Sequence, residues 1–116
     1  MIELPEGSAM ARYQRYIDEL EQLHGWTEVD LVHNCFFMGE EVGELFKAIR
    51  KYKHMWDETT GQPHDAKEDP ALKTAVAEEI VDVFNYLLSI ANRMDIDLEK
   101  AFRDKNARNQ TRTWSS

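Results

Sequence analysis

Two acidic segments contain the residues best suited to chemistry in this chain. Residues 40–44 read EEVGE and residues 78–82 read EEIVD, so that Glu41 with Glu44, and Glu79 with Asp82, stand three residues apart. In a helix, side chains at i and i+3 lie on one face. Each segment is therefore expected to present a pair of carboxylates in one direction.

Carboxylates gathered at one point require a counter-ion. Like charges at short range raise each other's pKa and destabilise the fold unless a cation joins them. Oxygen ligands without His or Cys suit Mg²⁺ first and Mn²⁺ next, and bound Mg²⁺ usually takes substrate phosphates as further ligands. The pattern therefore favours a metal site with a nucleotide substrate, and the competing interpretation is a solvated acidic helix face.

The spacing of apolar residues predicts four helices and no strand. The first helix follows a cap at Ser8, covers residues 10–24 and stops at Gly25; the second follows a cap at Thr27 and runs to Tyr52. The third follows Asp69 and Pro70 and reaches Met94, and Asp97 caps a shorter fourth helix. Residues 54–69 between the second and third helices have the composition of a loop, which contains Trp56.

The two long helices carry apolar seams that position the acids. The seams consist of Leu31, Cys35, Met38, Val42, Leu45, Ile49 and Tyr52 in the second helix, and of Val76, Ile80, Val83, Leu87, Ile90 and Met94 in the third. With heptad letters assigned to these seams, Glu41 and Glu79 both fall at g, and Glu44 and Asp82 both fall at c. Antiparallel pairing would set the acidic flanks opposite each other. Glu40 and Glu78 fall at f and face away, although Glu40 could still orient a water.

Composition limits the class of protein. The 116 residues carry a net charge of −8, which disfavours a nucleic acid polymer or a membrane surface as partner. Residues 1–116 are expected to form a single domain with flexible ends at 1–7 and 110–116, small enough that subunit association would complete its core. Lys47, Arg50, Lys51 and Lys53 suit the carboxyl end of the second helix, where cations complement the dipole. Cys35 reads as a core residue, and the absence of targeting or membrane-spanning signals predicts a cytoplasmic protein.

Three motifs together resemble those of the MazG-like all-α nucleoside triphosphate pyrophosphohydrolases. They are E-E-x-x-E at 40–44, E-x-x-D at 79–82 and K-x-x-x-N-x-x-R at 105–112. The resemblance, which includes dCTP pyrophosphatase-type relatives, implies an oligomeric four-helix bundle, a homodimer or a homotetramer. It also implies Mg²⁺-dependent cleavage of (d)NTP to (d)NMP and pyrophosphate, in the housecleaning of non-canonical or excess dNTPs.

The same resemblance implies roles for individual residues. Glu41, Glu44, Glu79 and Asp82 would hold Mg²⁺, with Mn²⁺ as a substitute, and a carboxylate of this cluster or Glu40 would accept a proton from water. Substrate contacts would come from Tyr86, Lys105, Asn109 and Arg112, the last three toward phosphates.

Several points stay open at this stage. Trp26 could stack on a base or fill the space between the first two helices, and His33 and Asn34 lie near a base-reading segment of similar enzymes. Lys51 stands where some deoxycytidine-preferring relatives have tryptophan, so the base preference is open. The alternative to an enzyme is a non-catalytic acidic helical interaction module, whose seams would pair with a partner.

Overall fold

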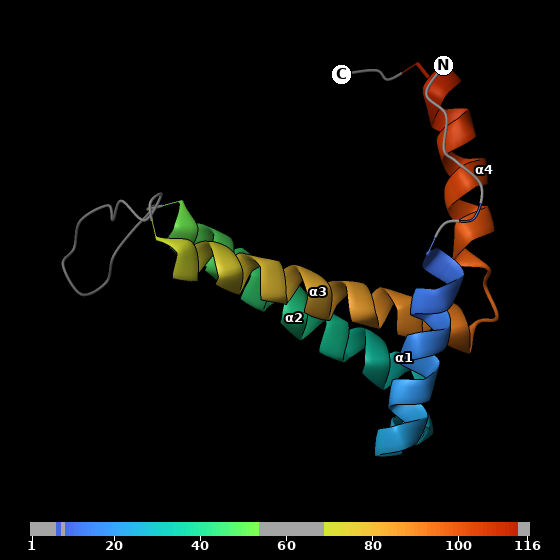
Figure 1. Cartoon of the computed structure of the whole chain (residues 1–116), viewed down its shortest axis with the longest axis horizontal. Helices are drawn as coiled ribbons and strands as arrows, with labels where there is room; N and C mark the ends of the chain where they lie inside the picture. The colour runs from blue at the N-terminus through green and yellow to red at the C-terminus, as the bar shows by residue number, and fades with distance from the viewer. Residues whose placement is uncertain (1–6, 8, 54–68, 114–116) are drawn as a thin grey trace. The chain divides into compact units, whose positions relative to one another are not determined.

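All regular secondary structure in the described part of the chain is helical. The computed structural model describes Gly7, residues 9–53 and residues 69–113 (Figure 1). Its elements are α1 (Met10–His24), the 3-10 turn η1 (Trp26–Glu28), α2 (Leu31–Tyr52), α3 (Pro70–Arg93) and α4 (Leu98–Thr111). No strand occurs among these residues, which confirms the predicted all-α class with four helices. The predicted cap Ser8, Trp56 and most of the predicted loop lie outside the described residues.

Three helix ends follow the capping chemistry expected from the sequence. Gly25 closes α1 in the left-handed conformation with φ 71°, which glycine adopts without steric cost. The Asp69 carboxylate accepts from Ala71 N at 2.9 Å, beside the start of α3. The Asp97 carboxylate accepts from Lys100 N at 3.1 Å, and α4 continues through Thr111, past the predicted flexible start at residue 110.

The predicted start of the second helix is wrong. Thr27 lies in η1, and α2 begins at Leu31 behind Asp30, whose side chain accepts from His33 N at 2.9 Å. The His33 ring also lies 2.7 Å from the second Asp30 carboxylate oxygen. These hydrogen bonds from His33 hold the pKa of Asp30 below its usual value. Aspartate therefore caps the helix because it engages the backbone N–H and the imidazole of His33 together.

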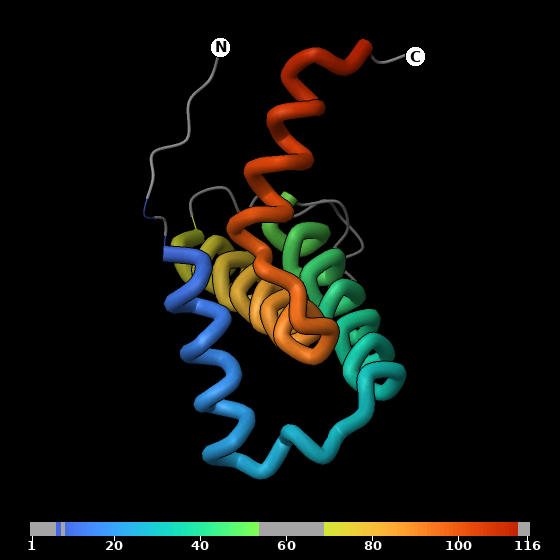
Figure 2. The backbone as a smooth tube through the Cα atoms, turned by 90° about the vertical axis from the view of Figure 1, so that its right-hand side faces the viewer, coloured from blue at the N-terminus to red at the C-terminus, as the bar shows by residue number. Residues whose placement is uncertain are grey.

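The chain divides into two compact units. The hairpin unit, Val29–Leu87, contains α2 and most of α3, which run antiparallel side by side (Figure 2). The terminal unit combines Met1–Glu28 with Leu88–Ser116, and so contains α1, η1, the end of α3 and α4. None of the described helices is long and apolar enough to cross a membrane.

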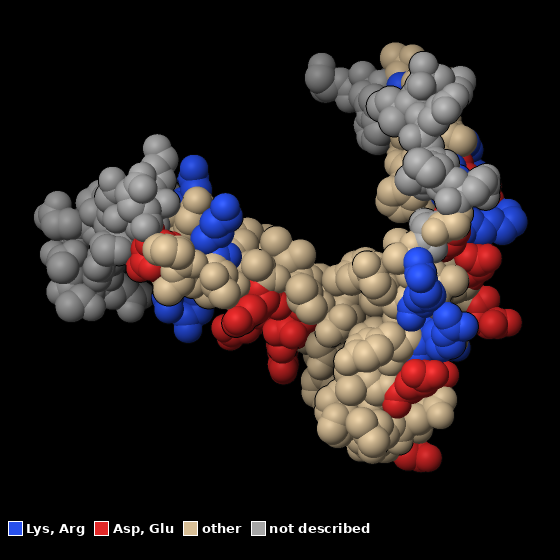
Figure 3. Space-filling model, viewed as in Figure 1, with Lys and Arg blue, Asp and Glu red and all other residues tan. Residues whose placement is uncertain are grey.

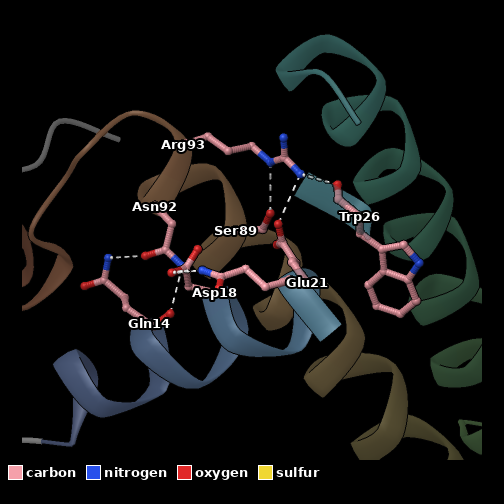
Figure 4. Close-up of polar contacts among 8 residues, drawn as sticks. Gln14, Asp18, Glu21, Trp26, Ser89, Asn92 and Arg93 are labelled. Carbon is pink, nitrogen blue, oxygen red and sulfur yellow. Dashed lines mark hydrogen bonds and ion pairs between the residues drawn. The ribbon is translucent and has the colours of Figure 1, made fainter. Parts of the chain in front are cut away.

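A small apolar core and a buried ion pair hold the terminal unit together. Ile17, Leu88 and Ala91 are its buried apolar side chains. Beside them, the Arg93 guanidinium donates to Glu21 Oε2 at 3.1 Å and to the Trp26 carbonyl at 3.0 Å (Figure 4). The Arg93 and Glu21 side chains are only 16% and 13% exposed, so the pair is shielded from water. One guanidinium thus fixes α1 and η1 to the end of α3.

Gln14 ties α1 to the connection between α3 and α4. Its amide donates to Asn92 Oδ1 at 3.1 Å and to the Ile96 carbonyl at 2.9 Å, and its oxygen accepts from Leu98 N at 3.1 Å. Asn92 returns a hydrogen bond to the Gln14 carbonyl at 2.8 Å. The backbone of this connection is thereby satisfied by a side chain from the other end of the chain.

In the hairpin unit, only some residues of the two predicted apolar seams are buried. Val42 and Val83 are partly buried as predicted, but Ile80 is 52% exposed, and Cys35, predicted in the core, is exposed. Glu79, predicted on the flank, is more buried than Ile80. The reason is that α3 is apolar on more than one face, so periodicity alone could not select the face that packs inside the chain.

Candidate metal site

Three of the four predicted ligands come together in the hairpin unit. Glu41 of α2 and Glu79 and Asp82 of α3 each have a carboxylate oxygen within 4.8 Å of the others. Glu41 and Glu79 are partly buried and Asp82 is exposed. Figure 3 shows acidic side chains gathered midway along the hairpin. The antiparallel pairing of α2 and α3 produces this convergence, because it sets one acidic segment beside the other.

The carboxylates of the cluster repel one another. The pKa of Glu41 is raised, first by burial, then by a hydrogen bond that it shares with Glu79, and then by repulsion from Asp82, Glu79 and Glu44. Glu79 Oε2 is enclosed by protein and has no hydrogen-bond partner in the described part of the chain. An enclosed acceptor without a donor costs free energy, about 1–3 kcal/mol for an ordinary polar group and more for a charged one.

The residues fit a hard divalent cation. Octahedral Mg²⁺ at about 2.1 Å from its ligands sets neighbouring oxygens about 3.0 Å apart and opposite oxygens about 4.2 Å apart. Three carboxylate oxygens within 4.8 Å of one another offer such an ion the all-oxygen donor set that it prefers. Glu79 would also offer such an ion an oxygen that the described residues leave without a hydrogen-bond donor. The oxygen donors of the cluster and the enclosed Glu79 Oε2 therefore suit a hard divalent cation.

The remaining acids of the two segments lie around this centre. Glu44 is exposed and is not one of the three converging residues, but it lines a hollow together with Glu79. Glu40 and Glu78 are exposed, as their f positions predicted. Tyr86, one turn after Asp82 on α3, is partly buried. The roles assigned to Glu44, Glu40 and Tyr86 remain predictions.

Trp26, His33 and Asn34, the residues considered for base recognition, differ in their exposure to solvent. Trp26 is 50% exposed and its ring stacks on His24, with centroids 4.4 Å apart and planes 20° apart, so its interpretation as a buried aromatic is wrong. His33 is exposed and Asn34 is 5% exposed. A half-exposed indole on a stacked partner is suited to receive a base, which leaves Trp26 as a predicted substrate contact.

The predicted phosphate contacts lie on α4 and at its end, in the terminal unit. Lys105 and Arg112 are exposed and Asn109 is partly buried. The Asn109 amide donates to Asn106 Oδ1 at 3.2 Å, while Asn109 Oδ1 is enclosed without a hydrogen-bond partner among the described residues. Because these residues and the acidic cluster belong to different units, their contribution to one site remains a prediction.

One feature near the cluster was not recognised as a site from the sequence. A hollow of about 200 Å³ in the hairpin unit begins at Glu44 and Glu79 and extends to Lys47 and Lys51. The sequence offered a signal, because Lys47 and Lys51 are one turn apart on the same helix that carries Glu44. The helix dipole explains both lysines, and Lys51 also stands where some deoxycytidine-preferring relatives have tryptophan, but neither observation predicts a hollow.

Comparison with known proteins adds an independent line of evidence. A family model described as the MazG nucleotide pyrophosphohydrolase domain matches residues 34–114. The chain is also 28% identical over 99 residues to the uncharacterized protein YvdC of Bacillus subtilis (strain 168), an alignment that covers 83% of this chain and 91% of that protein. The family match contains both acidic segments and the closing K-x-x-x-N-x-x-R, whereas α1 and Trp26 precede it.

Proposed function

The chain belongs to the MazG nucleotide pyrophosphohydrolase family, and we propose that it is a Mg²⁺-dependent enzyme that cleaves (d)NTP to (d)NMP and pyrophosphate. The observation that carries this proposal is the convergence of Glu41, Glu79 and Asp82, one of which has an enclosed oxygen without a hydrogen-bond partner among the described residues. Its role would be the housecleaning of non-canonical or excess deoxynucleotides, in the cytoplasm.

In this proposal Glu41, Glu79 and Asp82 hold the cation, and Glu44 joins them from the adjacent turn of α2. A divalent ion at this position would neutralise phosphate charge and lower the pKa of an attacking water. Mn²⁺ would substitute because it prefers the same oxygen donors. The protein's own contribution is to keep several carboxylates pointed at one place at the cost of their mutual repulsion.

Proton transfer falls to the same carboxylates. Hydrolysis consumes one water and releases one proton, which a carboxylate of the cluster would accept. Glu40 is the alternative acceptor, since it lies next to Glu41 and is exposed to water. Substrate contacts are assigned to Tyr86, Trp26, Lys105, Asn109 and Arg112.

The first experiment measures pyrophosphate release. Purified protein with Mg²⁺ and a panel of normal and modified dNTPs and NTPs is expected to release pyrophosphate and the monophosphate from at least one of them, and EDTA is expected to stop the reaction. Release of orthophosphate instead would place the cut elsewhere in the phosphate chain. If the folded protein releases pyrophosphate from none of these nucleotides, the non-catalytic interaction module would be favoured.

We further propose that the protein is a homodimer or homotetramer. The hairpin unit exposes large apolar side chains on both helices, among them Phe36 (69%), Phe46 (67%) and Ile80 (52%). Its described residues include no fully buried apolar side chain, because Ile17, Leu88 and Ala91 all belong to the terminal unit. Two helices alone cannot enclose a core, so association would supply the missing burial.

Phe36→Ser tests this association. Loss of an interface aromatic costs about 2 kcal/mol or more, so the subunit dissociation constant is expected to rise by about 30-fold or more. Sedimentation velocity across a dilution series measures the change, with Lys53→Ser at the exposed end of α2 as the control. A wild-type protein that stays monomeric at the highest concentration would contradict the proposal.

A further inference from the structure

The charge of the residues that line the hollow beside the acidic cluster changes from negative to positive along its length. Glu44 and Glu79 line one end, and Lys47 and Lys51 line the other, with Ala48, Leu72 and Ala75 also contributing to its walls. Along α2 the order Glu44, Lys47, Lys51 places the cationic end toward the carboxyl end of the helix. In Figure 3, basic side chains lie farther toward that end of the hairpin than the acidic group.

The two lysines are available to a ligand. Both are exposed, and neither has an ion-pair partner within 4 Å among the residues that the structure describes. Lysines at i and i+4 are neighbours on a helix, so their ammonium groups repel each other unless an anion lies with them. The two lysines thus place positive charge at one end of a hollow whose other end is lined by Glu44 and Glu79.

The ligand that matches this polarity carries a metal at one end and negative charge at the other. A volume of about 200 Å³ holds a group much larger than one water. Lysine offers three donors on a compact charge, which suits phosphate oxygens approached from different directions. A phosphate chain that starts at the metal centre would meet Lys47 and Lys51 farther along α2.

We propose that Lys47 and Lys51 bind the pyrophosphate portion of the substrate, so that the phosphate chain runs from the acidic cluster toward the carboxyl end of α2. This inference rests on the proposed function. It gives the substrate a direction in the hairpin unit, because the nucleoside must then leave the cluster on the side away from Lys51.

The lysines would act on the leaving group. Water oxygen forms a bond to the α phosphorus, and the bond from that phosphorus to the oxygen bridging to the β phosphorus breaks. The bonding electron pair remains on that oxygen, which leaves as part of pyrophosphate, and the proton of the water passes to a carboxylate of the cluster. Two ammonium groups at the leaving side offset the charge that develops there.

Binding of inorganic pyrophosphate in the presence of Mg²⁺ tests the proposal without turnover. Isothermal titration calorimetry on Lys47→Gln, Lys51→Gln and the double variant is expected to show dissociation constants raised about tenfold or more in the double variant. Arginine at both positions is expected to restore most of the affinity. Lys53→Gln, which removes an exposed charge outside the hollow, is expected to bind as the wild type does, and circular dichroism checks that all variants are helical.

The outcomes separate this proposal from the proposed function. Lysine-dependent binding by a protein that hydrolyses no nucleotide would support the anion site and reject the enzyme. Active enzyme with unchanged pyrophosphate affinity in the double variant would keep the enzyme and overturn the site. A change in base preference without a change in pyrophosphate affinity would also overturn it, because the hollow would then hold the base. Failure of the wild type to bind pyrophosphate with Mg²⁺ would overturn it directly.

Discussion

Glu79→Gln is expected to lower pyrophosphate release by at least about 100-fold while the protein keeps its fold. Even residues behind metal ligands typically contribute 10–100-fold to activity, and a proposed ligand should contribute no less. Glutamine has the shape of glutamate but lacks its charge, so it cannot replace the enclosed Oε2 as an anionic ligand. In the metal-free protein its amide could instead donate to Glu41, which would relieve the repulsion between the two side chains.

The stability of this variant distinguishes a lost ligand from a damaged fold. The melting temperature of metal-free Glu79→Gln is expected to equal or exceed that of the wild type, with activity measured on the best substrate of the panel. Glu78→Gln is the matched control, since Glu78 is the exposed neighbour on the same helix. Full activity in Glu79→Gln, or equal loss in both variants, would remove Glu79 from the proposed site.

The second large effect concerns pH and Glu41. The pKa of Glu41 lies above its usual value of 4.5 in the folded protein. As pH rises above 4.5, the unfolded chain therefore releases this proton first, and the free energy of unfolding decreases until the folded-state pKa has also been passed. Glu41→Gln removes this loss, so the metal-free variant is expected to melt a few degrees higher than the wild type at neutral pH, with a flatter pH profile.

Thermal melting between pH 4.5 and 7.5 measures this, with EDTA and then with Mg²⁺. Mg²⁺ is expected to raise the wild-type melting temperature at neutral pH and to have little effect on Glu41→Gln. Asp30 and Asp104, whose pKa values are lowered from 3.8, stabilise the fold above that pH and so do not vary in this window. A wild-type profile that rises from pH 4.5 to 7 without metal would contradict the electrostatic account of the cluster.

Local sequence chemistry predicted the helices well and one boundary poorly. Gly25 and Asp97 act through the backbone immediately beside them, so their effects can be read from a few residues. Thr27 is also a good capping residue in isolation. Asp30 caps α2 instead, because its carboxylate binds both the backbone N–H and the ring of His33. This preference depends on side-chain geometry that the residue pattern does not contain.

Which apolar face packs inside the chain could not be predicted in the same way. Ile80 and Leu87 follow the heptad spacing, yet they are 52% and 46% exposed, while Glu79 is partly buried. A helix that is apolar on two faces offers two solutions to the same periodicity. A face used for association between subunits has the same composition as a face used for the core, so only tertiary contacts separate them.

The acidic centre was predictable because its geometry follows from helix periodicity and antiparallel pairing. Spacing of three residues fixed Glu79 and Asp82 on one face, and the pairing of α2 with α3 brought Glu41 to them. Periodicity could not tell that Glu44 would lie outside the closest group. Periodicity also did not predict the hollow at Lys47 and Lys51. A hollow depends on the space beside small side chains such as Ala48 and Ala75, which is set by how the two helices pack.

The division of the chain also bears on the order in which it folds. The hairpin unit is one continuous segment, Val29–Leu87, whereas the terminal unit joins the two ends of the sequence through hydrogen bonds such as that from Leu98 N to Gln14 Oε1. Contacts of such long sequence separation form late, because closing a long loop costs entropy before any contact repays it. During synthesis, every residue of the hairpin unit, the acidic cluster included, is therefore present before α4 exists, whereas the terminal unit must wait for both ends of the chain.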